Sequence, residues 1–287
     1  FQGLDAAGKQ TLRDFSAALD FDVTEWKSLR AKAEYFKDAY PIFAFLAIWM
    51  DEAGLREPLE RFGDILRAAM YGIAGYGILD VNVDSSGSSP VEILTANALV
   101  AEYESALLKV FGVTQVNLGI LHRIRSLFLQ AEIREKRLRG KTSPYSLEFP
   151  KACGFKAAHL LTAFMLSLES LEKSDLIDDY FDVFFLFGAV IQIIDDWKDL
   201  EDDLTVGHYS YVTLGFEKDL GKGSPRETAR RLRGDAAHVR RVYERCKAMI
   251  ADSQAILERL NDPFLARIVT VTDLRLDSFF RKELKMA

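Results

Sequence analysis

The sequence predicts an all-α bundle. Apolar residues recur at three- and four-residue intervals along nearly the whole chain, which is the spacing of one face of an α-helix. No stretch gives a convincing ladder of strands, and no segment repeats. Hydrophobic residues make up 49% of the 287 residues, enough for one large core or two smaller ones. No linker long enough to separate two domains is visible, so we expect one domain over residues 4–287.

Glycine, proline and serine mark the ends of the predicted helices. Pro41 can open a helix as its first residue, and 85–90 and 140–150 have the composition of loops. The connection at 215–225 is glycine-rich and expected to be flexible. The helices are expected at 11–37, 41–50, 59–84, 91–111, 116–138, 155–171, 176–204, 226–260 and 263–285.

Composition excludes several classes of protein. The formal net charge of −6 implies no general affinity for nucleic acid. Cys153 and Cys246 give neither a disulfide framework nor a metal-ligand spacing, so we expect a cytoplasmic protein. The longest uncharged apolar runs, at 40–50 and 183–194, are too short to span a bilayer. No signal peptide is visible, and residues 1–3 resemble the remnant of a cleavable tag.

A cluster of carboxylates follows the apolar run at 183–194. Asp195, Asp199 and Asp203 are four residues apart, so on a helix they share one face and form an acidic ridge. Gln192 lies one turn earlier, near the same face. Like charges at this spacing repel unless a cation lies between them. Magnesium suits such a cluster, because it prefers oxygen ligands and commonly bridges one or two carboxylates to a substrate phosphate.

The alternative is a solvated acidic face, which is the usual meaning of a charge run. The preceding segment argues against it, because residues 183–194 are apolar all round, as in a helix buried in a core. The acidic ridge therefore begins where a buried helix approaches a cavity or the surface. We expect a metal site there.

A second acidic pair ends the helix expected at 59–84. Asp80 and Asp84 are four residues apart and share a helical face, although a lone pair of this kind is common on the wet side of a helix. Its position is more informative, since it closes an apolar helix and precedes a loop, as the acidic ridge does. We expect the two acidic sites to face each other across one cavity. Tyr76 would lie one turn deeper than Asp80 and help to set the depth of that cavity.

A diphosphate held near these carboxylates also needs cationic partners. Arginines precede the loop at 140–150, and Lys141 lies within it. We expect most of them to be solvated and Lys141 to be the best diphosphate ligand, because loops carry binding groups. The basic series comprises Arg123, Arg125, Arg134, Arg137, Arg139 and Lys141.

Together these residues resemble motifs of the trans-prenyltransferase and class I terpene synthase superfamily. The stretch GAVIQIIDDWKD at 188–199 is similar to the second aspartate-rich motif, GxxFQxxDDxxD, with its glycine, glutamine and three aspartates in register. The stretch DVNVD at 80–84 is similar to the first motif, DDxxD, with Val81 in place of the second aspartate. Such short motifs are hypotheses until their structural context is known.

Two further stretches fit the same family order. Gly140, Lys141 and Thr142 resemble the family's lysine–threonine pair, whose lysine holds diphosphate. The stretch DLTVGHYS at 203–210 is similar to the later DLxxGKxT, with His208 in place of lysine. The resemblance spans most of the chain and implies an isoprenoid synthase fold around a deep apolar pocket. Three magnesium ions and an allylic prenyl diphosphate would lie at its mouth.

The resemblance also assigns roles to particular residues. Aromatic rings could stabilise a carbocation in the pocket, with Phe184, Phe185 and Phe187 as candidates beside two tyrosines. The implied metal ligands are Asp80, Asp84, Asp195, Asp196 and Asp199, of which Asp80 and Asp195, with Lys141, would serve catalysis. The implied substrate-binding residues are Lys141, Thr142, Gln192, Tyr76, Tyr71, Arg123 and His208.

Departures from the family pattern decide between its activities. Chain-elongating members carry an arginine pair after the first motif, where this chain has SSGSSP at 85–90. They also carry a basic GKxxRP-like segment near the N-terminus, where this chain has KDAYP at 37–41. Both would hold isopentenyl diphosphate, and an anion without cationic donors binds poorly. We therefore expect a terpene synthase that ionises one allylic diphosphate, cyclises the carbocation and releases diphosphate.

Two alternatives stay open. One is a prenyltransferase or polyprenyl diphosphate synthase that joins the allylic diphosphate to an acceptor. The other is a non-catalytic isoprenoid-binding or partner subunit, which Val81 and His208 suggest. The expected partner is a small-molecule prenyl diphosphate, with a homodimer left open.

Overall fold

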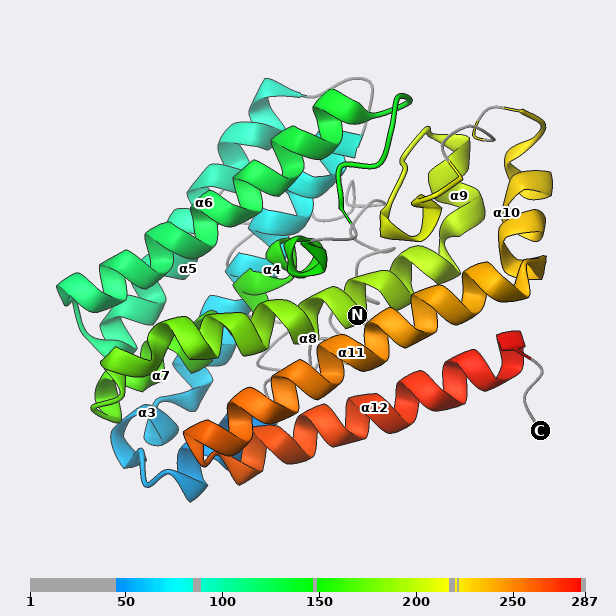
Figure 1. The fold of residues 1–287 in the computed structure, drawn as a ribbon. Coiled ribbons are helices and arrows are strands. Elements are labelled where there is room, and N and C mark those ends of the chain that lie inside the picture. Colours follow the sequence, from blue (N-terminus) through cyan, green and yellow to red (C-terminus); the bar gives the residue numbers. More distant parts are fainter. Residues whose placement is uncertain (1–44, 85–88, 147–148, 217–219, 221, 285–287) are drawn as a thin grey trace. The chain divides into compact units, whose positions relative to one another are not determined.

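The computed structural model describes residues 45–84, 89–146, 149–216, 220 and 222–284. Within these ranges every regular element is helical, which confirms the all-α prediction (Figure 1). None of the described helices is long and apolar enough to cross a membrane. The chain divides into two compact units, Phe1–Thr114 and Gln115–Ala287. The expectation of a single domain stays a prediction, and the helix expected at 11–37 lies outside the described residues.

In the first unit, two long helices pack along each other. Ser89 caps the second helix, its hydroxyl accepting from the Glu92 amide, and Pro90 occupies the first turn. Gly72 lets the two helices approach closely, because a Cβ there would lie 2.9 Å from the Tyr103 ring. The helices are α3 (Arg56–Glu60), α4 (Phe62–Asp84) and α5 (Pro90–Phe111), preceded by helical residues 45–52.

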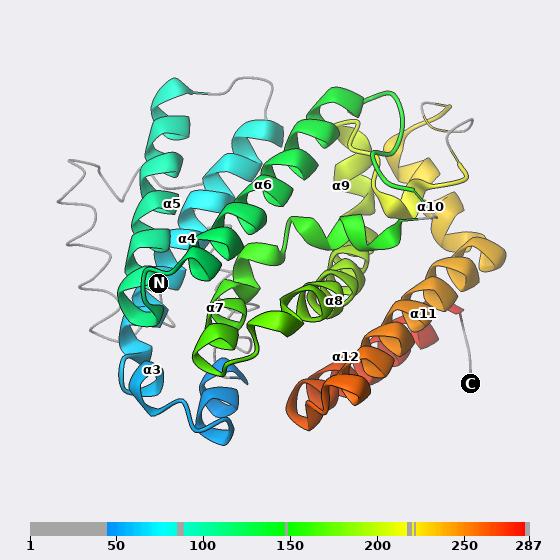
Figure 2. The ribbon, with the colours of Figure 1, turned by 60° about the vertical axis from the view of Figure 1, so that its left-hand side comes forward.

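In the second unit, α8 is packed against η2 and α11, and α11 against α12 (Figures 1 and 2). Trp197, Tyr180 and Phe181 of α8 are almost fully buried, as the apolar sequence of this helix predicts. The elements are α6 (Gln115–Leu138), η2 (Pro150–Phe155), η3 (Ala158–Leu161), α7 (Thr162–Ser170), η4 (Ser174–Leu176), α8 (Ile177–Lys198), α9 (Leu200–Thr205), η5 (Tyr211–Thr213), α10 (Pro225–Gly234), α11 (Ala236–Leu260) and α12 (Pro263–Leu284).

Four of the expected helices are interrupted. The helix predicted at 59–84 breaks at Arg61, between α3 and α4. The helix predicted at 155–171 begins where the 3₁₀ helix η2 ends and includes the 3₁₀ helix η3, and only α7 is α-helical. The helix predicted at 226–260 is two helices, because Asp235 leaves the helical conformation and its carboxylate caps the amides of Ala237 and His238 at 3.0 and 3.1 Å. The helix predicted at 176–204 breaks at Asp199.

The glycine that opens the aspartate-rich stretch has a packing role. Gly188 of α8 lies against Gly154 of η2, and a Cβ on Gly188 would come within 3.3 Å of the Gly154 Cα. The opposite approach is closer still, since a Cβ on Gly154 would lie 2.8 Å from the Ala189 amide nitrogen and nearer to the Phe185 carbonyl oxygen. Only a glycine pair allows this contact between backbones.

The substitution Gly154→Ala is therefore expected to destabilise the protein by about 1–3 kcal/mol, because backbone atoms cannot yield to the added methyl group. Gly119→Ala on α6 is the matched control, since a Cβ there meets nothing within 4 Å. The control should gain up to about 1 kcal/mol from helix propensity. Chemical denaturation of both variants measures the difference, and equal stability of the two would refute the close contact.

Candidate functional site

The acidic ridge survives the break between α8 and α9. The Asp199 amide donates to the Asp195 carbonyl at 3.0 Å, and the Asp203 amide donates to the Asp199 carbonyl at 2.9 Å. These i to i−4 bonds keep the three side chains on one face. Asp195 is half exposed, Asp199 is exposed, and Asp203 is mostly buried. Asp203 is therefore the most buried of the three.

Asp196 lies beneath the ridge and is buried. The Gln192 side-chain amide donates to Asp196 Oδ1 at 2.8 Å, so the glutamine of the aspartate-rich stretch orients this carboxylate. Asp196 Oδ2 is buried without a hydrogen-bond partner among the described residues. Burial raises the pKa of Asp196 to about 7, and the charge of Asp203 adds to the effect. A bound cation would relieve both costs.

A second aspartate pair, on α12, has a lysine ammonium in contact with both of its carboxylates. Asp273 and Asp277 of α12 have the same four-residue spacing, but Lys247 Nζ lies 2.5 Å from one and 3.1 Å from the other. Tyr243 also donates to Asp277 at 2.9 Å. Although burial raises it, the pKa of Asp277 is lowered overall by the hydrogen bonds from Tyr243 and Lys247. This pair already has its cation.

The pKa of Asp199 is shifted upwards, in the opposite direction to that of Asp277. Burial raises its pKa, and the charges of Asp195 and Asp203 raise it further, while Lys198 lowers it less. The Lys198 ammonium lies 3.7 Å from Asp195, at the limit of an ion pair, and both side chains are about half exposed. The acidic ridge thus retains mutual repulsion that the Asp273–Asp277 pair does not.

The donors of the acidic ridge fit a hard divalent cation. They are carboxylate oxygens, the ligands that magnesium prefers, and the orphaned Oδ2 of Asp196 lies beside them in the sequence. In the described part of the chain, no three Asp, Glu, His or Cys side chains converge closely enough to form a preformed metal cluster. Asp195 and Asp199 are the residues that could hold magnesium in this unit, with Asp196 in support.

A buried ionic cluster lies around Glu135 of α6. The Lys156 ammonium lies 2.9 Å from Glu135 and 3.2 Å from Glu132, and both glutamates are almost fully buried. The Tyr145 hydroxyl donates to Glu135. His208 Nε2 lies 3.3 Å from the same carboxylate. We call Glu132, Glu135, Tyr145, Lys156 and His208 the Glu135 network.

Sequence reasoning missed the two glutamates, yet a signal was present. Glu135 continues the buried stripe of α6 formed by Ile124, Phe128 and Ala131, at the spacing of a core-facing helical surface. A charged residue on such a stripe needs buried partners. It was overlooked because the neighbouring residues of α6 are mostly charged and suggest a solvated helix.

His208 carries a positive charge in this setting. Although burial lowers it, the pKa of His208 is raised to about 11 by hydrogen bonds from its ring to Asp203 and Glu135. Its Nδ1 lies 3.3 Å from Asp203. The pKa of Glu135 is lowered to about 2, because the charge of Lys156 and the contacts with His208 outweigh burial. The histidine is thus a cation at a position where the motif that this stretch resembles has a lysine.

The structure brings the Lys141 loop and the His208 loop together. The Gly140 amide donates to the Gly207 carbonyl at 2.8 Å, and both glycines have positive φ, 69° and 71°. Tyr145 and His208 meet on the carboxylate of Glu135 from the two loops. Lys141 itself is exposed, with its ammonium 3.3 Å from the Arg137 carbonyl. Thr142 beside it is half-buried.

Other predicted residues of this unit have packing partners. Arg123 pairs with Asp178 and lies 3.9 Å from the centre of the Phe181 ring. Phe184 and Phe185 are buried, with the Phe185 ring 4.8 Å from that of Phe155. These contacts give the side chains structural roles, and their expected roles at a substrate pocket stay predictions.

The first aspartate pair belongs to the other unit. Asp80 and Tyr71 are half-buried, whereas the side chain of Asp84 lies outside the described residues. Tyr76 is 2% exposed and makes an edge contact with Tyr103 at 6.2 Å. The expected meeting of the two acidic sites across one cavity, and the apolar pocket itself, stay predictions.

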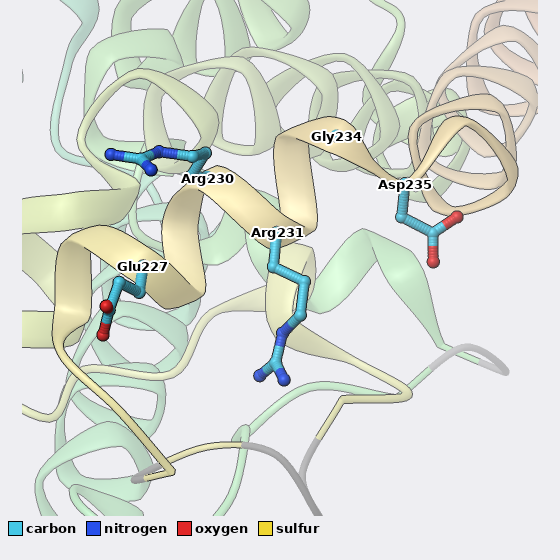
Figure 3. Close-up of a pocket in the computed structure, with 5 residues that line it drawn as sticks. All are labelled: Glu227, Arg230, Arg231, Gly234 and Asp235. Atoms are coloured by element: carbon cyan, nitrogen blue, oxygen red, sulfur yellow. The ribbon is translucent and has the colours of Figure 1, made fainter.

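A cleft of about 470 Å³ beside α10 is not suited to the expected chemistry. Figure 3 shows Glu227 and Arg231 on one side of α10, Arg230 on the other, and Asp235 at the end of the helix. Glu227 forms the capping box with Ser224, and Asp235 caps α11. The two carboxylates of this cleft therefore cap the N-termini of helices.

Comparisons with family models, curated proteins and solved structures gave no significant match. The likeness to isoprenoid synthases thus depends on the motifs and on the geometry of the residues that carry them.

Substituting Lys156→Met is expected to destabilise the protein by about 3–5 kcal/mol, because it leaves Glu132 and Glu135 buried with too little positive charge. Lys151→Met is the control. Its ammonium lies 2.5 Å from Asp182, but both side chains are partly exposed, so the loss should stay below about 1 kcal/mol. Urea unfolding of both variants provides the measurement, and a Lys156 variant as stable as the control would contradict the buried network.

The ion pair of Glu135 and His208 should give stability a defined pH dependence. The pKa of His208 rises from 6.5 to about 11 on folding, so its contribution is complete below pH 6.5 and is lost as pH rises towards 11. The pKa of Glu135 falls from 4.5 to about 2, so its contribution is lost as pH falls from 4.5 towards 2. The difference in unfolding free energy between wild type and His208→Gln should therefore be largest at about pH 4.5–6.5. A difference that grows above pH 7 would contradict this assignment.

Proposed function

We propose that this protein is a class I terpene synthase that ionises an allylic prenyl diphosphate, cyclises the carbocation and releases diphosphate. The observation that carries the proposal is the acidic ridge. It combines aspartates in the register of the second aspartate-rich motif, a buried Asp196 held by Gln192 and a net repulsion at Asp199. The similarly spaced Asp273–Asp277 pair has none of these features, and a single cation, Lys247, contacts both of its carboxylates.

Each acidic residue has a role in the proposal. Asp195 and Asp199 would hold magnesium from α8, and Asp196 would support them. Asp80 and Asp84 are the second pair of ligands that the family resemblance implies. Magnesium, when bound, supplies charge stabilisation for the departing diphosphate.

The two basic loops would bind the diphosphate. Lys141 is exposed in the turn that follows α6, where its ammonium can reach an anion. His208 contributes its positive charge from the adjoining loop, whereas both its ring nitrogens face carboxylates. We therefore assign His208 mainly an electrostatic role, and Thr142 a hydrogen-bonding role next to Lys141. The Glu135 network would hold the loops in place while substrate enters.

The two alternatives differ from this proposal in what happens to the substrate. A prenyltransferase would transfer the allylic group to an acceptor such as isopentenyl diphosphate, for which residues 85–90 offer no arginine pair. A non-catalytic subunit would bind prenyl diphosphate without releasing inorganic diphosphate. One assay separates the three activities.

The assay incubates the protein and magnesium with C10, C15, C20 or C25 allylic diphosphate, with and without labelled isopentenyl diphosphate. We expect metal-dependent release of diphosphate and formation of a hydrocarbon or alcohol, with no label in a longer chain. Asp195→Asn should lower the rate at least about 100-fold while the fold persists, because it removes the charge of a metal ligand and retains its shape. Asp273→Asn, which changes the neutralised pair, should stay within about twofold of wild type.

Two results would count against the proposal. Incorporation of label into a longer prenyl diphosphate would favour a prenyltransferase. Absence of diphosphate release with every substrate, from folded protein that still binds them, would favour the non-catalytic subunit.

A further inference from the structure

A second pocket in the Gln115–Ala287 unit carries positive charge. It has a volume of about 290 Å³ and lies between η5 and α11. This is close to the lower end of the roughly 300–1,000 Å³ usual for small-molecule sites. Its polar lining includes Tyr211, His238, Arg241 and Arg245, with Leu214 and Val242 among the apolar residues. The two arginines are one helical turn apart, so they share a face of α11.

Arg241 is held in a fixed orientation. Its Nη2 donates to Nδ1 of His238 at 3.0 Å. Its guanidinium nitrogens lie against Gly215, where φ is +88° and a Cβ would be 3.6 Å from them. His238 is almost fully buried between Trp197, stacked at 5.9 Å, and Phe216, in edge contact at 4.7 Å. A rigid, neutral ring therefore orients the cation.

The electrostatics of the pocket agree with this arrangement. Burial lowers the pKa of His238, and the charge of Arg241 lowers it further, so the ring accepts a hydrogen bond as neutral imidazole. Arg245 interacts with the buried hydroxyl oxygen of Tyr211. Glu244 is the acidic residue in the lining, against two guanidinium groups. The lining thus has a formal charge of +1 (two Arg, one Glu).

We propose that this pocket binds a small molecule through a phosphate or diphosphate group. A guanidinium presents several N–H donors in a planar fork that matches phosphate oxygens. The hydrogen bond from Arg241 to His238 uses one of these donors. The apolar lining residues leave room for a short hydrocarbon part of the same ligand. The site differs in charge from the acidic ridge, so it requires no magnesium. It is independent of the proposed synthase activity.

The contrast with the α10 cleft supports a ligand site at α11. Both pockets contain two arginines, but the α10 cleft also contains two carboxylates that cap helices. There the charges balance within the protein. At α11, Arg241 is aligned by a neutral histidine, and the lining holds one carboxylate, Glu244, against two guanidinium groups.

The test is calorimetric titration of the whole protein with inorganic diphosphate in the presence of EDTA, which removes magnesium from the acidic ridge. We expect wild type to bind, and Arg241→Met and Arg245→Met to bind at least tenfold more weakly. Arg240→Met is the matched control, because Arg240 is an exposed neighbour on α11 outside the pocket lining. It should bind within about twofold of wild type, and Tm values should confirm that every variant is folded.

Two outcomes would overturn the proposal. One is the absence of binding by wild type under these conditions. The other is an equal loss in Arg240→Met, which would show attraction to general surface charge. Since magnesium is absent, a positive result is also compatible with failure of the synthase assay, and the two proposals can fail separately.

Discussion

The arrangement around the acidic ridge depends on the contacts that the buried carboxylate of Glu135 makes. It receives Lys156 at 2.9 Å, His208 at 3.3 Å and the hydroxyl of Tyr145. These partners come from three separate segments of the chain, so one carboxylate fixes all three relative to α6. A buried charge is tolerated only when it is paired, which makes the segments depend on one another.

Opposite charge balance distinguishes the Glu135 network from the acidic ridge. In the network, two cations neutralise buried glutamates, and the pKa of Glu135 is lowered to about 2. On the ridge, burial and the charges of Asp195 and Asp203 raise the pKa of Asp199, and Asp196 retains an orphaned buried oxygen. The folded chain thus neutralises the glutamates of the network internally, whereas repulsion persists at Asp199 on the neighbouring ridge. His208 connects the two, since its ring contacts Asp203 on one side and Glu135 on the other.

Periodicity was sufficient to predict the fold class and most helices, because long amphipathic helices dominate the chain. It failed at local breaks. Asp235 follows the end of α10 and caps α11. An aspartate at this place is a helix-start signal, but the apolar pattern continues on both sides of it, so one long helix was predicted. The four-residue spacing predicted one helical face for Asp195, Asp199 and Asp203, which agrees with the backbone hydrogen bonds, while their role as metal ligands stays a prediction. The Glu135 network could not be predicted in full, since its members meet only through tertiary contacts.

The central claim is that the acidic ridge holds magnesium, and the most direct measurement is the Tm of the protein during magnesium titration. A ligand that binds only the folded state stabilises it by RT ln(1 + L/Kd), where L is the free ligand concentration, so Tm rises with the logarithm of that concentration once it exceeds Kd. Wild type and Asp277→Asn should show a Tm that rises with magnesium in the presence of inorganic diphosphate, and Asp199→Asn should show little rise. Without metal, Asp199→Asn should be slightly more stable than wild type, because one repulsive charge is gone. A magnesium response of the same size in Asp199→Asn as in wild type, or none in wild type, would contradict the claim.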